Sequence, residues 1–220
     1  DGANYNTGLG VDVFAALTTG DENVAIGYNA LDANTTGSAN IAIGYDTLTT
    51  NTEGTVNTAV GREAMKFNTT GDNNVAIGKR ALYLNTTADD NVAVGYESLF
   101  LNTTGTLNVA VGSFALDAND TGDANVAVGK SSLSANTTAD YNTAVGHNTL
   151  AANTTGTQNT ALGALALDAN TTASSNIALG YKALSGNTTG SLNVAVGNQA
   201  LQANTTAAYN TAVGYDSLST

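Results

Sequence analysis

Cysteine, proline and tryptophan are absent from this 220-residue sequence. The lack of cysteine excludes disulfides and thiol chemistry. The lack of proline leaves every backbone N–H group in place, as suits a structure that uses nearly all of them in hydrogen-bonded ladders. Aromatic residues make up only 6% of the chain, and the apolar side chains are mainly Ala, Val, Leu and Ile. We therefore expect a thin and regular core.

Positive charge is also scarce. Six Lys and Arg residues stand against 18 Asp and Glu residues, which gives a net charge of −12. Such a chain repels nucleic acid and anionic membrane surfaces. No apolar run in the sequence reaches the roughly 18 residues of a membrane-spanning helix. We expect neither a nucleic-acid partner nor membrane insertion.

Repetition is what the sequence has in abundance. Glycine recurs every 17 residues without insertion or deletion, at positions 10, 27, 44, 61, 78, 95, 112, 129, 146, 163, 180, 197 and 214. Each of these repeat glycines is preceded by Asn four residues earlier, by Ala two residues earlier in all repeats but the first, and by Val, Ile or Leu directly. Leu follows four residues later, replaced only by Phe14 and Met65, and Asn-Thr-Thr follows seven to nine residues later with few exceptions.

The charged residues obey the same period. Apart from Asp1, Glu53 and Asp120, every Asp, Glu, Lys and Arg lies one, two, five, eleven or twelve residues after a repeat glycine. We expect these five positions to face water and the others to be enclosed.

A period of 17 residues is too short for a pair of helices, and Asn, Thr and Gly are poor helix formers. It fits one coil of a parallel β-solenoid, in which each coil stacks about 4.8 Å from the next. The sequence therefore predicts an all-β chain in which residues 1–220 form a single repeat domain of about 13 coils. Residues 23–27 (NVAIG) are predicted as a strand, residues 30–34 as a second strand or a bend, and residues 35–39 as the closing turn.

Alternation along the strand places Val24 and Ile26 on one side and Asn23 and Ala25 on the other. We expect the Val and Ile side chains to fill the coil. The nearly unvaried Ala side chains must then abut either the opposite wall of a flat coil or a neighbouring chain, and we favour a neighbouring chain because small residues allow close packing. The candidate subunit interface comprises Ala25, Ala42, Ala59, Ala76, Ala93, Ala110, Ala127, Ala144, Ala161, Ala178, Ala195 and Ala212.

The Asn positions predict ladders of stacked amides at the corners of the coil. One such structural ladder comprises Asn23, Asn40, Asn57, Asn74, Asn91 and Asn108. The repeat glycines predict either a positive φ or a backbone too crowded for a Cβ atom. A second glycine, ten residues later, is replaced by alanine at Ala88, Ala139, Ala173 and Ala207, so we do not expect a left-handed conformation there.

The Asn-Thr-Thr motif allows two further interpretations. In a host that glycosylates extracellular proteins it offers sequons. These are at Asn34, Asn68, Asn85, Asn102, Asn119, Asn136, Asn153, Asn170, Asn187 and Asn204. Regular threonine arrays can also order water, which makes an ice-binding solenoid an alternative function. Adjacent threonines in a strand point to opposite sides, so we expect them in a turn and not in a flat double row.

No repeat gathers a catalytic set. The single histidine, His147, takes a position that is Tyr in several other repeats, and we interpret it as a solvated surface residue. Acidic pairs such as Asp21 with Glu22 lack the glycine-spaced aspartates of a calcium-binding β-roll. Phosphate-binding glycine motifs are missing as well. We expect no enzyme, no cofactor and no metal site.

The phrases NVAIG (residues 23–27) and NTAVG (residues 57–61) resemble the NSVAIG-type repeats in the head domains of YadA-like trimeric autotransporter adhesins. The longer pattern NTAVGYxALxxNTTG is similar to repeats in phage and bacterial tail-fibre-like proteins. The adhesin resemblance implies a left-handed parallel β-roll, three of which associate side by side into a surface fibre. The 17-residue period and the Asn-Thr-Thr positions depart from the adhesin pattern.

These observations predict a structural or adhesive fibre or filament subunit that self-associates, as a homotrimer or end to end. We expect it outside the cell, on the cell surface or on a virion, with a host surface or glycan receptor as an attachment partner. The alternatives are the ice-binding solenoid and the receptor-binding tail-fibre shaft of a phage.

Overall fold

A computed structural model describes residues 2–219 as an all-β chain of stacked coils, which confirms the predicted parallel β-solenoid. Each 17-residue repeat contributes one short strand, and the described residues contain no helix. The chain divides into two compact units, one ending at Asn108 and the other beginning at Val109.

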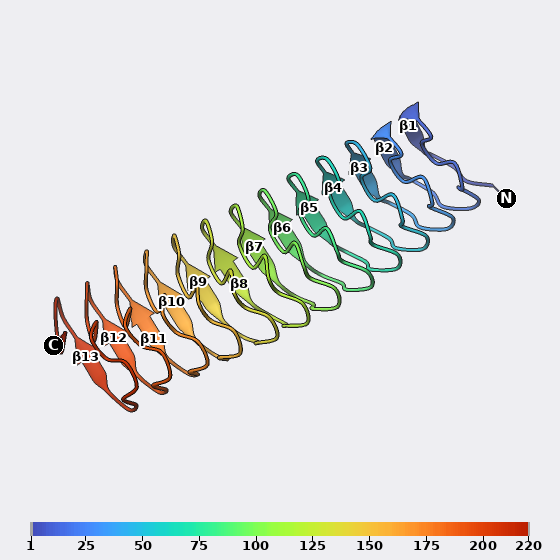
Figure 1. Cartoon of the computed structure of the whole chain (residues 1–220). Coiled ribbons are helices and arrows are strands. Elements are labelled where there is room, and N and C mark those ends of the chain that lie inside the picture. The colour runs from blue at the N-terminus through green and yellow to red at the C-terminus, as the bar shows by residue number, and fades with distance from the viewer. Residues whose placement is uncertain (1, 220) are drawn as a thin grey trace. The chain divides into compact units, whose positions relative to one another are not determined.

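The first unit holds six strands, each paired in parallel with the next in chain order (Figure 1). They are β1 (Thr7–Val11), β2 (Val24–Tyr28), β3 (Ile41–Ile43), β4 (Thr58–Val60), β5 (Val75–Ile77) and β6 (Val92–Val94). Equivalent residues face one another across every pair, so that Ala25 lies beside Ala42 and Ala42 beside Ala59.

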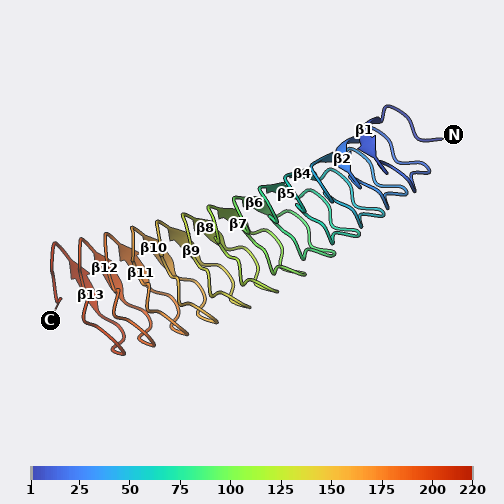
Figure 2. The same cartoon turned by 45° about the horizontal axis from the view of Figure 1, so that its top comes forward.

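The second unit holds seven strands with the same consecutive parallel pairing. They are β7 (Val109–Val111), β8 (Val126–Val128), β9 (Thr143–Val145), β10 (Thr160–Leu162), β11 (Ile177–Leu179), β12 (Val194–Val196) and β13 (Thr211–Val213). In both units the strands line one side of the coils, and turns complete the rest of each coil (Figure 2).

Turns make up most of each coil, and residues 30–33 form a turn and not a second strand. Hydrogen bonds nevertheless join these turns to the next coil. The Leu31 N–H donates to the Thr47 carbonyl over 3.2 Å, and the Thr35 N–H donates to the Thr52 carbonyl over 2.9 Å. Because coil-to-coil bonds run around the cross-section, one inserted residue would misalign a whole coil, which accounts for the strict period.

Three non-glycine residues in each coil adopt a left-handed backbone. They lie two, four and twelve residues after the repeat glycine, and their φ angles fall between 47° and 62°. Each such residue costs about 1–2 kcal/mol relative to a right-handed conformation. The coil therefore depends on its buried leucines and its inter-coil hydrogen bonds to hold these corners.

The repeat glycines satisfy both conditions that the sequence suggested. Their φ angles lie between 131° and 144°. A Cβ atom on Gly61 would also lie 2.5 Å from the Gly78 carbonyl oxygen of the next coil. The second glycines have no positive φ, as expected from their replacement by alanine.

The interior of the coil differs from the expectation. The strand alanines point inward and are 0–4% exposed within the single chain, whereas the Val, Ile, Leu and Thr residues on either side of them point outward. The inward alanines are Ala25, Ala42, Ala59, Ala76, Ala93, Ala110, Ala127, Ala144, Ala161, Ala178, Ala195 and Ala212. The assignment of these residues to a subunit interface is therefore wrong.

Volume explains the reversal. The leucines four residues after the repeat glycine, such as Leu82 and Leu99, are fully buried and occupy the interior. Because protein interiors are close-packed, the strand wall of so narrow a coil has room only for a methyl group. The unvaried alanine thus marks the inside of the coil, against the opposite wall of the same chain.

Candidate functional site

The first asparagine ladder lies inside the coil beside the strands. All six predicted members, Asn23, Asn40, Asn57, Asn74, Asn91 and Asn108, are 0% exposed. The Asn40 backbone N–H donates to Asn23 Oδ1 over 2.9 Å, and the Asn57 N–H donates to Asn40 Oδ1 over 3.0 Å. Each side chain thereby ties its own coil to the next one.

The asparagines of the Asn-Thr-Thr motif form a second ladder. Asn51 Nδ2 donates to Asn34 Oδ1 over 2.9 Å and to the Gly54 carbonyl over 3.0 Å. The same Gly54 carbonyl accepts from Asn40 Nδ2 over 2.8 Å. The second glycine position therefore joins the two ladders through its carbonyl oxygen, which explains why Gly or Ala suffices there.

Burial of the second ladder decides the glycosylation hypothesis. A glycan is attached through Asn Nδ2, and here that atom is enclosed and hydrogen-bonded. The residues that are 0% exposed are Asn34, Asn68, Asn85, Asn102, Asn119, Asn136, Asn153, Asn170 and Asn187. Only Asn204, in the last coil, is partly exposed. Glycan decoration of the folded coils at these nine positions is therefore excluded.

The threonines of the motif lie in bends, as expected. The first hydroxyl of each pair bonds to the backbone of the next coil: Thr35 Oγ1 donates to the Thr52 carbonyl over 2.9 Å, and Thr69 Oγ1 donates to the Thr86 carbonyl over 2.9 Å. These hydroxyls serve the stack itself, which weakens the case for an ordered water array on this edge.

Four of the six basic residues lie in the first unit, and two of them pair with acidic residues of adjacent coils. Lys66 Nζ lies 2.8 Å from Asp46 Oδ2, and Arg80 Nε lies 2.7 Å from Glu63 Oε2. The hydrogen bond from Arg80 lowers the pKa of Glu63, and the hydrogen bond to Asp46 raises the pKa of Lys66. Each pair stays within the chain and leaves no open binding site between its members.

Large exposed apolar residues collect on one face. Of the 20 that are exposed, 18 lie five, three or one residues before a repeat glycine, or directly after it. These four positions define what we call the outer sheet face. Its exposed apolar members are Tyr5, Leu9, Val11, Tyr28, Ile41, Tyr45, Val56, Ile77, Tyr96, Leu107, Tyr141, Leu162, Ile177, Tyr181, Leu192, Tyr209, Val213 and Tyr215. This face was not predicted from the sequence, because the Val and Ile side chains were expected inside the coil.

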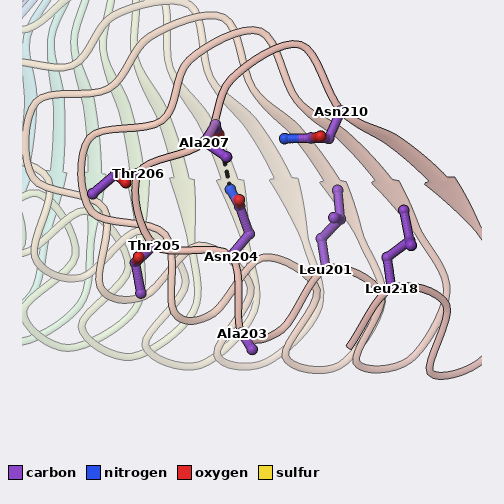
Figure 3. A pocket seen from close by; sticks show the side chains of 8 residues that line it. All are labelled: Leu201, Ala203, Asn204, Thr205, Thr206, Ala207, Asn210 and Leu218. Carbon is purple, nitrogen blue, oxygen red and sulfur yellow. Dashed lines mark hydrogen bonds between the residues drawn. The ribbon is translucent and has the colours of Figure 1, made fainter. Parts of the chain in front are cut away.

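The last coil of the second unit presents a hollow of about 310 Å³ (Figure 3). Leu201 and Leu218 line it, together with Asn204, which donates to the Ala207 carbonyl over 3.0 Å. Leu218 is 62% exposed, whereas Leu184, at the same position two coils earlier, is fully buried. The hollow is therefore the uncovered interior of a coil, formed by groups that the following coil encloses elsewhere.

The remaining chemistry-bearing residues are dispersed. His147 is exposed beside β9, which agrees with its interpretation as a surface residue. Within residues 2–219, no cluster of three or more His, Asp or Glu side chains could hold a metal ion. The same residues contain no helix of the length and hydropathy needed to cross a membrane.

The two asparagine ladders, the outer sheet face and the open end of the last coil are thus the features from which a function can be argued. No known protein family model matches this sequence, and no curated protein or solved structure matches it significantly.

Proposed function

We propose that this chain is a structural segment of an extracellular fibre or filament, in which stacked coils continue end to end and carry an attachment surface. The observation that carries the proposal is the continuous enclosure of one coil by the next: the leucines four residues after the repeat glycine, such as Leu167 and Leu184, are fully buried within the stack. A further coil of this sequence, from the same chain or from another copy, can extend the stack in the same way.

The bonding between coils supports the same role. Each step of the stack repeats the strand pairing and both asparagine ladders, as between Asn57 and Asn74, where the Asn74 N–H donates to Asn57 Oδ1 over 2.9 Å. Nearest-neighbour bonding of this kind lets a stack grow without a change in its local structure. A long and stiff assembly follows from adding identical coils.

Attachment falls to the exposed positions, since the interior positions hardly vary between repeats. Tyr28 and Tyr45 stack outside the coil with ring centroids 5.3 Å apart, and Arg62 lies over the Tyr45 ring at 5.3 Å. Exposed Tyr and Arg side chains are the residue types that anchor protein partners most strongly. The resemblance to adhesin head repeats supports the same assignment.

Electron microscopy of the purified 220-residue chain tests end-to-end growth. In β12 the Val194 N–H donates to the Asn210 carbonyl of the next coil over 2.8 Å, and the acceptor for the equivalent Thr211 N–H would lie in a further coil. Thr211→Pro removes this donor and leaves the hydrogen bonds within the chain intact. Thr211→Val is the matched control, because Val takes the same position in β12.

We expect filaments from the unmodified chain and from Thr211→Val, and short or single particles from Thr211→Pro. Filaments should also resist protease and heat better than dispersed chains. If the unmodified chain forms no filaments at high micromolar concentration, or if both Thr211 variants form them equally, end-to-end growth is wrong.

A further inference from the structure

We propose that the outer sheet face binds the same face of a second copy of this chain, with the coils of both copies stacked in the same direction. The inference rests on the proposed structural role, because lateral pairing would join filaments or their subunits side by side. Lateral pairing uses the outer sheet face, which end-to-end growth does not require.

The face is unusual for a surface exposed to water. In the first unit, Ile41 is 38% exposed, Ile77 41% and Leu9 68%. The neighbours of Ile77 and Leu9 on the adjacent strands are all apolar, whereas Ile41 lies between an apolar neighbour and a threonine. Contiguous apolar patches of several hundred Å² on soluble proteins mark interaction sites. An apolar sheet face normally packs against a second layer.

The area is sufficient for a stable pair. Six strands spaced about 4.8 Å apart, each presenting about 17 Å of chain across the face, give roughly 500 Å² in the first unit. Two such faces of the first unit would together bury roughly 1,000 Å², which is about the total area that a specific interface needs. The seven strands of the second unit give a face of roughly 600 Å² by the same reasoning, so each unit taken by itself presents enough area.

The periodicity of the face favours a second copy over an unrelated protein. The residue directly before the repeat glycine is Val, Ile or Leu on all six strands of the first unit, so an apolar side chain recurs at the strand spacing. A surface that matches this repeat along its whole length must have the same spacing, and another copy of this face has it. Two such sheets pack face to face with their strands nearly aligned.

The two borders of the face differ in charge. The border directly after the repeat glycine carries Arg62, Lys79 and Lys130 and no acidic residue. The border five and six residues before that glycine carries no basic residue. Its acidic members are Asp21, Glu22, Asp72, Asp89, Asp90, Asp123 and Asp140. We call these the basic border and the acidic border.

The acidic groups nearest the basic border are already engaged within the chain. Asp46 pairs with Lys66, and both Glu63 and Glu97 lie close to Arg80, at 2.7 and 3.6 Å. Lys79 lies over the Tyr96 ring at 5.5 Å. It keeps its full charge, because an aromatic ring does not neutralise a cation.

Charge complementarity sets the orientation. If the two-fold axis runs along the stacking direction, the basic border of each copy meets the acidic border of the other. Between two first units, Lys79 then faces Asp72 at the level of β5, and between two second units, Lys130 faces Asp123 at the level of β8. Asp72 Oδ1 also accepts hydrogen bonds in its own chain from the Thr55 N–H and hydroxyl, at 2.6 and 3.0 Å, but these donors are uncharged, so the attraction to Lys79 remains. If the axis runs along the strands, acidic border meets acidic border, and like charges repel. Both orientations bring the apolar positions of the two faces together, so the charges of the borders select between them.

Sedimentation of the full chain measures the pairing. Thr211→Pro is used as the background, so that axial growth does not obscure it. Ile77→Glu with Val92→Glu places two carboxylates on the outer sheet face and leaves the buried positions unchanged. The control, Thr70→Glu with Thr87→Glu, adds the same charge at exposed positions where Glu53 occurs naturally.

We expect a dimer from the background chain and from the control. The face variant should raise the dimer dissociation constant at least about 100-fold, because pairing would bury carboxylates without partners. Circular dichroism and thermal melting verify that the variant remains folded. A monomer or a trimer from the background chain, or equal dissociation constants for the two variants, would overturn the pairing.

Spin labels test the orientation. The chain has no cysteine, so single labels can be placed at Thr36→Cys, Thr70→Cys and Thr104→Cys, which are exposed equivalent positions two coils apart in the first unit. Parallel pairing gives the same distance between copies at all three sites. Antiparallel pairing cannot, because three evenly spaced sites cannot all lie equally far from one perpendicular axis, and unequal distances would overturn the proposed orientation.

The two proposals fail separately. Dimers that never form filaments in the unmodified chain would contradict end-to-end growth and leave the pairing intact. Filaments one chain thick, unaffected by Ile77→Glu with Val92→Glu, would contradict the pairing and leave the structural role intact.

Discussion

Replacement of one ladder asparagine should destabilise the stack far more than its small change in volume suggests. Asn57→Ala removes the Oδ1 atom that accepts from the Asn74 N–H at 2.9 Å and the Nδ2 group that donates to the Gly71 carbonyl at 2.8 Å. The Gly71 carbonyl keeps its second donor, Asn68 Nδ2, at 3.0 Å. The Asn74 N–H, by contrast, loses its acceptor inside the coil.

Asn57 Oδ1 also accepts from Asn74 Nδ2 over 3.2 Å, but Asn74 Nδ2 keeps the Ala88 carbonyl as an acceptor at 2.8 Å. The cost therefore follows mainly from the unpaired Asn74 N–H and the lost bond from Asn57 Nδ2. A buried donor without a partner costs about 1–3 kcal/mol, and a lost hydrogen bond whose acceptor remains satisfied costs about 1 kcal/mol. We therefore expect Asn57→Ala to cost about 2–4 kcal/mol. The control is Asn198→Ala, at an exposed position that is occupied by Ala164 in another coil. It should change stability by no more than about 0.5 kcal/mol.

Hydrogen exchange is the suitable assay, because repeat stacks need not unfold in one cooperative step. Exchange of the Asn74 amide should accelerate by roughly 30-fold or more in Asn57→Ala, the factor that corresponds to about 2 kcal/mol. Urea unfolding provides a second measure of the loss. Asn57→Ala and Asn198→Ala variants of equal stability and equal exchange would refute the buried ladder.

Five further substitutions, in three groups, test other parts of the coil by thermal and urea unfolding. Val56 is β-branched with φ of 58°, so Val56→Asn should stabilise by about 1 kcal/mol, and the reverse change at the equivalent Asn73 (φ 57°) should destabilise by a similar amount. Burial raises the pKa of the Asp168 carboxyl, and its Oδ1 has no hydrogen-bond partner. The folded state thus disfavours its ionised form, and Asp168→Asn should raise the melting temperature at pH 7 and lose this advantage below about pH 4. Gly61→Ala should cost at least about 3 kcal/mol, because its Cβ meets the next backbone at a φ that favours glycine. A Cβ on Gly71 would also meet a backbone carbonyl of the next coil, that of Ala88, but Gly71 has no positive φ. Gly71→Ala should therefore cost less, as the natural alanines at the equivalent position indicate. Equal effects of the two glycine changes, a destabilising Val56→Asn, or a pH-independent effect at Asp168 would each contradict the corresponding argument.

The coil and its ladders could be predicted from the sequence because a period reports which residues stack, whatever the direction of their side chains. Thirteen glycines without an insertion require an in-register stack, and Asn at two fixed positions of that stack requires amide ladders. At residues 30–34 the sequence allowed either a strand or a bend, since leucine is compatible with both strand and turn, and the structure has a turn. Leu31 in this turn has a left-handed φ that arises from packing in the coil, and the conformational preference of leucine does not predict it.

The inside and the outside of the strand could not be assigned by alternation, which separates two faces without saying which one is buried. Hydrophobicity favoured Val24 and Ile26 as the interior, and the structure places Ala25 there. The decisive signal was variability. The outward position of Val24 accepts Thr in Thr58 and Thr143, whereas the inward position remains Ala from β2 onward. The residue three positions after the repeat glycine shows the same low variability: it is Ala, Ser or Thr in every repeat after the first.

Cryo-electron microscopy of concentrated, unmodified chain tests the central claim, that the stack of coils is itself the functional structure, most directly. The account predicts filaments in which coils recur about every 4.8 Å along the axis and continue from the last coil of one chain into the first coil of the next. Dispersed single chains at every concentration, or filaments whose coils do not stack along the filament axis, would contradict it.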